Sequence, residues 1–327
     1  MTAVLGGLGA AIIWAAGSTF ASRATRVLGP RLTLAWVMLV GLVALGLILP
    51  WTGAPHLTAA AVFWLVLSGA GNVAGLLILY HALRIGQLGV VMPIVTTEGG
   101  IAALLAILAG EPLHNGVAWA LLVTVIGVIM TAIARRPAGS PSSSPATSPS
   151  TSTSTSLSPE AETAAESAGG RLTRNPPDHP RAVPTPTGHH DRRAAAWAIA
   201  GAVSFGIGLF ATGRASHLLP TAWAVLPPRL IGVAVITLPM ALSRQLRVPR
   251  GVWPALLVAG LCELAGFFAY ATGTHHGIAV TAVLATLTGV IGAGSGRLFF
   301  GERLQRTQVL GIAVTFAGVA TLAGLTA

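Results

Sequence analysis

The chain has 327 residues, of which 53% are hydrophobic and 9% are charged, and its mean hydropathy is +0.76. Because soluble proteins carry about 25% charged residues, this composition excludes an ordinary soluble protein and predicts an all-α integral membrane protein. The net charge of +10 comes from 19 arginines, no lysine and nine acidic residues. Most of the arginines flank apolar segments, which indicates topology signals and lipid-headgroup anchors rather than nucleic-acid binding. The single cysteine, Cys262, excludes an internal disulfide and a cysteine-based metal cluster.

Ten apolar segments follow one another along the chain, separated by short connections that contain Arg, Pro or Gly. Their hydrophobic residues do not alternate, and only helices or closed barrels satisfy the backbone in lipid, so we predict ten transmembrane helices. The predicted spans are Val4–Phe20, Leu32–Leu49, Ala59–Leu83, Gly89–Ala109, Val117–Ala134, Ala195–Gly213, Ala222–Leu242, Val252–Gly273, Ile278–Phe300 and Val309–Leu325.

The segment between the fifth and sixth spans, residues 135–194, has a different composition. It contains the tract SPSSSPATSPSTSTSTSLSPE, an acidic patch, and further Pro and Arg, with few large apolar residues. Such a segment cannot bury enough apolar surface to offset its conformational entropy, so we expect a disordered tether. His189 and His190 lie in it without a second histidine pair or a cysteine nearby, which argues against a metal site.

The tether separates two copies of one pattern, residues 1–134 and 195–327. A shift of 191 residues places Arg23-Ala24 on Arg214-Ala215, Trp14 opposite Phe205 and Gly110-Glu111 on Gly301-Glu302. Each copy holds five predicted spans. Because five is odd, the two copies would enter the membrane in opposite senses, as in the inverted repeats of many secondary transporters.

Both copies close with a Gly-Glu turn, GEPL at Gly110–Leu113 and GERL at Gly301–Leu304. These turns, together with the segments WAAGSTFASRATR and LYHALRIGQLGVVMP, resemble the EamA family of the drug/metabolite transporter superfamily. The resemblance covers both apolar copies but not the tether. It implies two five-helix repeats, ten helices in all, that export or import small metabolites.

Three charged residues lie well inside predicted spans: Glu98, Arg229 and Glu263. None has an oppositely charged residue three or four positions away on its own helix, so each must pair across helices, line water or, for the acids, be protonated. One interpretation is a mid-membrane cavity with one fixed cation and two proton-exchanging acids. The other is an Arg229–Glu263 ion pair that holds helices together. We favour the ion pair for these two residues and a functional role for Glu98.

Aromatic and polar residues inside the spans are candidates for lining such a cavity, although a tryptophan in a span more often serves packing. They are Trp14, Trp36, Asn72, Tyr80, His81, Phe205 and Tyr270. We predict that the substrate or proton site contains Glu98, Arg229, Glu263, Trp14, Phe205, Asn72, Tyr80 and Tyr270. By contrast, Glu111 and Glu302 are expected to be turn and interface residues.

The sequence contains no HExxH motif, no nucleophile elbow and no phosphate-binding loop, so we expect neither an enzyme nor an ATP-driven pump, and no cofactor or metal. We predict a secondary transporter that moves a small polar or amphipathic metabolite by alternating access, with proton coupling as an option. The alternatives are a non-transporting membrane sensor or assembly module and a proton-coupled multidrug exporter.

The composition, free of Lys and rich in Ala, Gly, Pro and Arg, suggests a bacterial cytoplasmic membrane. Expected partners are a small-molecule substrate and the lipid bilayer, with a homodimer as an alternative to a monomer and no nucleic acid.

The arginine distribution predicts the orientation of the chain. The odd-numbered connections between the predicted spans, counted from the N-terminus, all lie on one face of the membrane, and the tether is the fifth of them. On the opposite face only Arg214 lies near the membrane boundary. The positive-inside rule therefore places the tether in the cytoplasm and both termini outside. Alkaline phosphatase fused after Ala327 should therefore be active. The resembling family usually has both termini in the cytoplasm, and an inactive phosphatase fusion with a fluorescent cytoplasmic reporter at the same position would contradict the prediction. The odd-numbered connections contain Arg23, Arg26, Arg31, Arg84, Arg135, Arg136, Arg192, Arg193, Arg244, Arg247, Arg250, Arg303 and Arg306.

Overall fold

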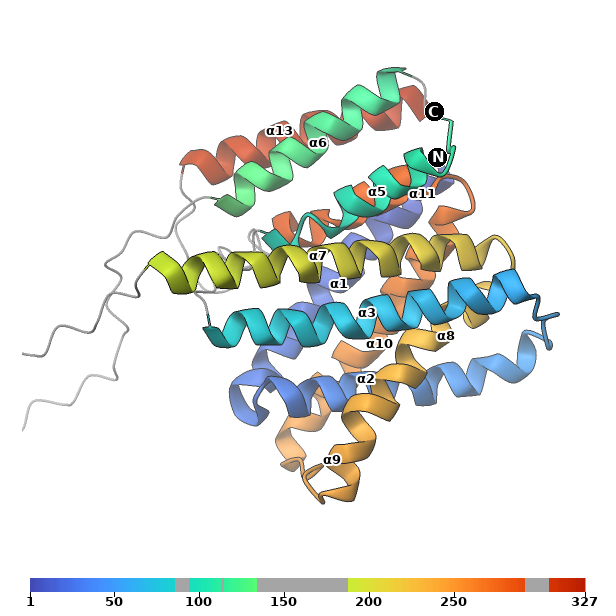
Figure 1. Ribbon diagram of the computed structural model, residues 1–327, viewed down its shortest axis with the longest axis vertical. Helices are drawn as coiled ribbons and strands as arrows, with labels where there is room; N and C mark the ends of the chain where they lie inside the picture. Colours follow the sequence, from blue (N-terminus) through green and yellow to red (C-terminus); the bar gives the residue numbers. More distant parts are fainter. Residues whose placement is uncertain (86–93, 113–114, 134–187, 292–305, 327) are drawn as a thin grey trace, which may run out of the picture. The chain divides into compact units, whose positions relative to one another are not determined.

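The computed structural model describes residues 1–85, 94–112, 115–133, 188–291 and 306–326, and all regular structure within these ranges is helical (Figure 1). A π-helical turn (Val233–Thr237) joins α8 to α9, and single 3-10 turns occur at Leu49–Trp51 and Arg250–Val252. The helices are α1 (Thr2–Leu28), α2 (Pro30–Ile48), α3 (Ala59–Ile85), α5 (Glu98–Leu108), α6 (Asn115–Ile133), α7 (Gly188–Ser216), α8 (Thr221–Gly232), α9 (Leu238–Leu242), α10 (Trp253–Thr274), α11 (Ile278–Ala285) and α13 (Arg306–Thr326).

Each predicted span overlaps helical structure, and six helical stretches in the described residues are long and apolar enough to cross a membrane. The ends of the helices differ from the prediction where the sequence lacks a helix breaker. Thus α1 continues past Phe20 to Leu28 and stops at Gly29, whose φ of 78° is unfavourable for other residues. Similarly, α7 begins at Gly188, inside the predicted tether, because no proline interrupts the following residues. Residues 135–187 of the tether lie outside the described part of the chain.

The predicted fourth span is not one continuous helix. Residues 94 and 95 are helical, Thr96 and Thr97 form a turn, and α5 then begins at Glu98. The ninth span is interrupted in a similar way, since α11 ends at Ala285 and a turn at Thr286 precedes further helical residues. In both turns a threonine hydroxyl donates to the carbonyl oxygen three residues earlier, Thr97 to Ile94 at 2.7 Å and Thr286 to Val283 at 2.6 Å. These bonds compete with the regular helical pattern and accompany the breaks.

The most extensive helix contacts join the two repeats rather than helices of one repeat: α3 with α7, α1 with α10, and α6 with α13 (Figure 1). Glycines allow the backbones to approach closely. A Cβ added to Gly71 of α3 would lie 2.8 Å from Gly208 Cα of α7, and one added to Gly6 of α1 would overlap Gly273 Cα of α10. The bundle is therefore held together by contacts between its halves.

The contacts follow the 191-residue offset found in the sequence. In the α6–α13 pair, Gly127 packs against Thr315 while Gly318 packs against Thr124. The two glycines are equivalent by the repeat offset, and so are the two threonines. The two helices are antiparallel, because the contacting residue numbers rise along one helix as they fall along the other. The α3–α7 pair is antiparallel by the same criterion, since Gly71 faces Gly208 and Gly75 faces Phe205.

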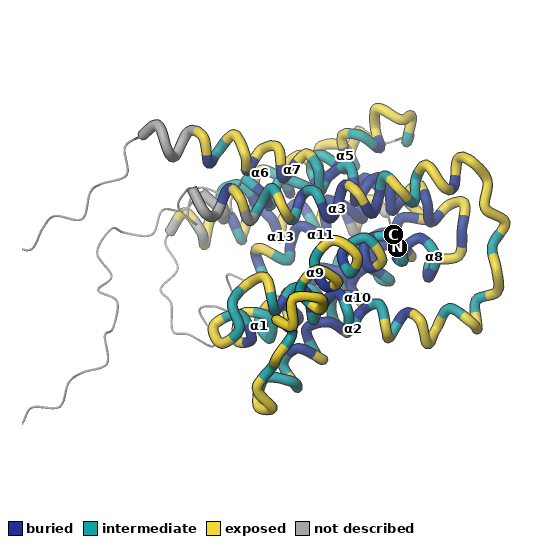
Figure 2. Tube along the Cα trace, turned by 60° about the horizontal axis from the view of Figure 1, so that its bottom comes forward, coloured by how far each residue is buried: buried dark blue, intermediate teal, exposed yellow. Residues whose placement is uncertain are grey.

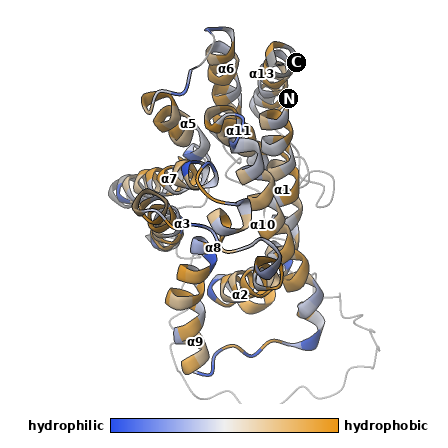
Figure 3. Ribbon diagram, turned by 90° about the vertical axis from the view of Figure 1, so that its right-hand side faces the viewer, coloured by the Kyte–Doolittle hydropathy of each residue, from blue (hydrophilic) through white to orange (hydrophobic). Residues whose placement is uncertain are grey.

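Buried residues lie where helices face one another, whereas the outward sides are exposed and apolar (Figures 2 and 3). Large apolar side chains remain exposed on several helices, for example Leu47, Leu108 and Trp119 at 71%, 74% and 68%. Apolar exposure of this extent is unfavourable in water and is expected where the surface meets lipid. The structure is therefore that of a multi-pass membrane protein.

The tight α3–α7 crossing leads to a first mutational prediction. Gly208→Ala should lower the unfolding temperature of the protein in detergent by an amount equivalent to about 1–3 kcal/mol, because the new Cβ would lie 2.8 Å from Asn72 N and 3.1 Å from Gly71 C. The matched control is Gly46→Ala in α2, where no atom lies within 4 Å of the added Cβ. Equal thermal stability of the two variants would contradict the assigned packing.

Candidate functional site

A cavity of about 290 Å³ lies among six helices, three from each repeat: α1, α2 and α3 with their repeat equivalents α7, α8 and α10. Its apolar wall carries a small number of polar groups, the usual composition of a small-molecule site. The lining residues are Trp14, Gly17, Ser18, Ala21, Thr25, Pro30, Thr33, Leu34, Val37, Met38, Asn72, Val73, Leu76, Phe205, Pro228, Arg229, Ala259, Glu263 and Phe267.

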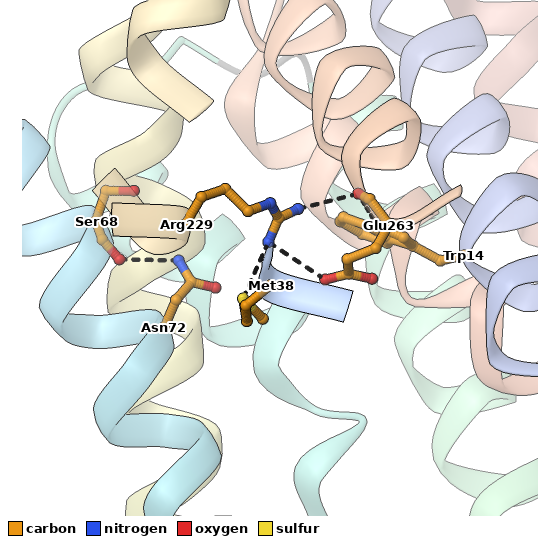
Figure 4. Close-up of polar contacts among 6 residues, drawn as sticks. All are labelled: Trp14, Met38, Ser68, Asn72, Arg229 and Glu263. Carbon is orange, nitrogen blue, oxygen red and sulfur yellow. Dashed lines mark hydrogen bonds and ion pairs between the residues drawn. The ribbon is translucent and has the colours of Figure 1, made fainter. Parts of the chain in front are cut away.

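Arg229 of α8 supplies a fixed cation to this cavity, although its side chain is only 1% exposed. Its Nη2 donates to the main-chain oxygen of Glu263 at 3.2 Å, and Nη1 lies 3.8 Å from Glu263 Oε1 and 3.7 Å from Met38 Sδ (Figure 4). The guanidinium also lies over the ring of Phe267, 4.7 Å from its centroid. Gly41 leaves room for it, since a Cβ there would be 3.1 Å from Arg229 Nε.

Two features show that Arg229 is incompletely satisfied. The Nε atom is buried and has no hydrogen-bond partner among the residues that the structure describes. The ion pair with Glu263 is long at 3.8 Å, whereas direct charge-assisted hydrogen bonds are about 2.7–2.9 Å. A buried cation with spare donor capacity can bind an acceptor group of a ligand in the adjoining cavity.

Glu263 of α10 differs from Arg229 in its access to the cavity. Its side chain is 33% exposed, so water or a ligand can reach the carboxylate while the guanidinium behind it stays buried. The arrangement contains both features that we weighed from the sequence, an ion pair between helices and a charged cavity wall. It can therefore hold a ligand on the carboxylate or exchange a proton there.

Aromatic and amide side chains complete the wall. Trp14 Nε1 donates to the main-chain oxygen of Glu263 at 3.3 Å, and its ring meets Phe267 edge-on at 5.0 Å between centroids. Phe205 packs its ring on Gly75, and Asn72 Nδ2 donates to Ser68 O at 2.9 Å (Figure 4). Trp14, Phe205 and Asn72 were all predicted from the sequence to line the site, and all three do line this cavity.

The repeat offset explains why these residues meet, and it contains a signal that our sequence analysis did not use. Met38 and Arg229 are 191 residues apart and touch each other. Asn72 and Glu263 are equivalent by the same offset, so both charged residues of this site, Arg229 and Glu263, stand where the first repeat has a neutral residue. Comparing the two repeats for positions that are charged in only one of them would have singled out Met38 with Arg229 and Asn72 with Glu263, and all four residues line the cavity.

Glu98 was predicted to share this site, but it does not line the cavity. It is the first residue of α5, where the helix N-terminus favours a negative charge. It is partly exposed, and no described residue makes a hydrogen bond or ion pair with its carboxylate.

The predicted Tyr270 also lies outside the cavity lining. Tyr270 is fully buried, stacks on Trp14 at 6.2 Å and donates its hydroxyl to Leu209 O at 3.1 Å, so it is a packing residue next to the cavity. The side chain of Tyr80 lies outside the described part of the structure. Outside the cavity lining, Trp36 packs on Trp253 and His81 on Trp197.

Glu111 lies at an interface between the repeats, as predicted. Its carboxylate accepts hydrogen bonds from the backbone N–H groups of Ile278 and Ala279, at 3.1 and 3.2 Å, at the start of α11. The equivalent Glu302 lies outside the described residues. The nearby His275 is exposed, as expected for a loop residue, and partial burial together with His217 and His276 lowers its pKa.

The comparisons with known proteins agree with this architecture. The model of the EamA-like transporter family matches residues 1–133 and 192–324, so that both copies of the repeat are matched. The chain belongs to the EamA family. This confirms the resemblance seen in the two Gly-Glu turns and places the protein in the drug/metabolite transporter superfamily. EamA proteins are transporters rather than enzymes, and this one is a membrane transporter by family.

No curated protein matches the chain. A solved crystal structure, described only as that of a protein, has a similar fold with a TM-score of 0.65 and 17% sequence identity. The match covers 99% of this chain and 96% of that one. At this identity the likeness concerns the fold alone.

Arg229 is buried whereas Glu263 is partly exposed, so removing one charge of the ion pair should affect stability differently from removing both. Glu263→Gln should destabilise the protein by about 1–3 kcal/mol, because it leaves the buried guanidinium without its carboxylate. Adding Arg229→Met to this variant should restore part of the loss, since the double variant contains no buried charge at this position. Thermal unfolding in detergent tests both changes, and a double variant less stable than Glu263→Gln would show that Arg229 contributes through packing instead.

Proposed function

We propose that this EamA-family protein is a secondary transporter that moves a small polar or amphipathic metabolite across a bacterial cytoplasmic membrane by alternating access. The central observation is the cavity between the repeats, in which a buried Arg229 adjoins an accessible Glu263. Its volume of about 290 Å³ is close to the lower end of the range for small-molecule sites, roughly 300–1,000 Å³. Charged groups beside Trp14 and Phe267 suit a compact ligand with both polar and apolar parts.

The proposed architecture is ten helices in two inverted five-helix repeats. Its support is the antiparallel packing of α6 on α13, which are the fifth helices of the two repeats by the 191-residue offset. Equivalent helices run in opposite directions only when the repeats are inverted with respect to each other. A cavity at the junction of inverted repeats can open to either face as one repeat moves against the other.

We also propose that protons drive the transport, with Glu98 and Glu263 as the exchanging groups. Both are acids in apolar spans, and Glu263 reaches the cavity directly. Glu98 starts the half-helix that follows the break at Thr96 and Thr97, a position typical of ion and substrate sites in transporters. Its repeat equivalent is Gly289, so this acid, like Glu263, occurs in one repeat only.

The substrate is best sought by ligand-induced thermal stabilisation of the purified protein, followed by uptake into proteoliposomes. A cavity lined by one chain does not require the homodimer that we considered as an alternative. Binding of a metabolite without any uptake would favour the non-transporting sensor. Uptake of many unrelated apolar cations would favour the multidrug exporter.

Glu98→Gln tests the proton-coupling proposal, because it keeps the shape and hydrogen bonding of the side chain while removing its titration. The variant should be folded and should bind the identified substrate, but its transport should be lost or become independent of pH between about 5.5 and 8. The measurement is proteoliposome uptake with and without a pH gradient. A natural control is Glu160→Gln, which removes a carboxylate in the tether. Transport by Glu98→Gln with an unchanged rate and pH profile would make this carboxylate structural.

A further inference from the structure

The lining of the central cavity reaches one end of the bundle but not the other, which we call the closed end because this cavity does not open there. Lining residues extend from Trp14 to Thr25 and Pro30 at the α1–α2 turn. At the opposite end, Ser216 and Thr274 are 1% and 0% exposed, and neither of them lines the cavity. Their hydroxyl oxygens are 2.9 Å apart and hydrogen bonded, which joins the end of α7 to the end of α10.

Glu111 lies at this closed end and connects the two repeats. Gly110, with φ of 90°, ends the α5 segment and turns the chain so that Glu111 reaches α11 of the second repeat. The carboxylate accepts from Ile278 N at 3.1 Å and from Ala279 N at 3.2 Å, two of the N–H groups that a helix start leaves without partners. A charged acceptor at a helix N-terminus is stabilised by both the hydrogen bonds and the helix dipole.

The helix that Glu111 caps is packed into the interior of the bundle. Every residue of α11, from Ile278 to Ala285, is buried, and the helix packs on both α1 and α5. Near its start the hydroxyl of Thr281, which donates to Gly277 O at 2.7 Å, also lies 3.3 Å from Ala3 O in the first turn of α1. The helix ends at the turn at Thr286, which separates it from the rest of its span. Movement of the start of α11 away from Glu111 would break both hydrogen bonds.

The surroundings of Glu111 lower the free-energy cost of such a movement. A second cavity of about 380 Å³ adjoins the carboxylate and is lined by Arg214, His217 and His276. All three are exposed, so water can enter and solvate the carboxylate once it leaves α11. The contact can therefore break without leaving an unsolvated charge.

We propose that Glu111 is a positioning residue that latches α11 and thereby closes the end of the bundle opposite the cavity opening. This latch rests on the proposed alternating access, because it assigns the described conformation to one side of that cycle. The latch connects the two repeats, so releasing it removes one of the contacts that hold this end of the two repeats together. Weakening it shifts the population toward the conformation that is open at the Ser216 end.

The test uses single cysteines in a Cys262→Ser background and a membrane-impermeant maleimide. Ser216→Cys reports on the closed end, and Ala21→Cys reports on the cavity wall. Adding Glu111→Gln should increase the labelling rate at position 216 by roughly tenfold, the scale of losing a helix cap, and should decrease labelling at position 21. Glu111→Asp, which keeps the charge on a shorter side chain, should give an intermediate shift and serves as the second variant if Glu111→Gln is not folded.

The matched control is Thr237→Val, which removes another bond between the repeats, from Thr237 Oγ1 to Ala35 O at 2.9 Å. It should not increase labelling at position 216. Unchanged labelling at 216 in both Glu111 variants would overturn the latch, and so would increased labelling there without a decrease at 21, since that pattern indicates local fraying. Because accessibility is measured without substrate, this result is independent of uptake, and failure to find a transported metabolite would count against the proposed function only.

Discussion

A guanidinium group that is 1% exposed inside an apolar helix bundle is the interaction around which the rest of this structure is arranged. An isolated charge in that environment costs several kcal/mol, so the protein must surround it with acceptors and polarisable groups. It does so with the carboxylate and main-chain oxygen of Glu263, the sulfur of Met38 and the face of Phe267. These groups come from two helices, α2 and α10, whereas the guanidinium itself comes from α8. Their helices are therefore constrained to meet at one level, and the cavity lies at that level.

The symmetry of the fold and the asymmetry of its charges have complementary consequences. Two copies of one five-helix pattern produce equivalent contacts, such as Gly127 on Thr315 and Gly318 on Thr124. The charged residues break this equivalence, because Arg229 faces Met38 and Glu263 has Asn72 as its counterpart. A symmetric charge set would place two arginines against each other near the junction of the repeats, where their repulsion would be poorly screened. One cation and one carboxylate instead give a nearly neutral site that can still bind polar groups.

Close backbone packing determines how accurately this site is built. Gly71 and Gly208 bring α3 against α7, and Gly6 and Gly273 bring α1 against α10. Such contacts set the rotation of each helix about its own axis, and rotation decides which side chains face the cavity. Asn72 follows Gly71 directly, and Glu263 follows Cys262, which packs on Gly17. The residues that line the cavity are thus positioned by glycine-mediated contacts next to them in the chain.

The sequence by itself determined the membrane class, the approximate spans, the duplication and its offset, and Arg229, Glu263 and Trp14 as residues of interest. These features depend on hydrophobicity and spacing, which are properties of the chain in one dimension. Only the tertiary structure decided that Tyr270 packs against Leu209 O, that Glu98 starts a half-helix outside the cavity, and that Glu111 caps α11 of the other repeat. Helix rotation, the non-proline breaks at Thr97 and Thr286, and contacts between residues more than 150 positions apart arise from packing between the repeats, and no local pattern specifies them.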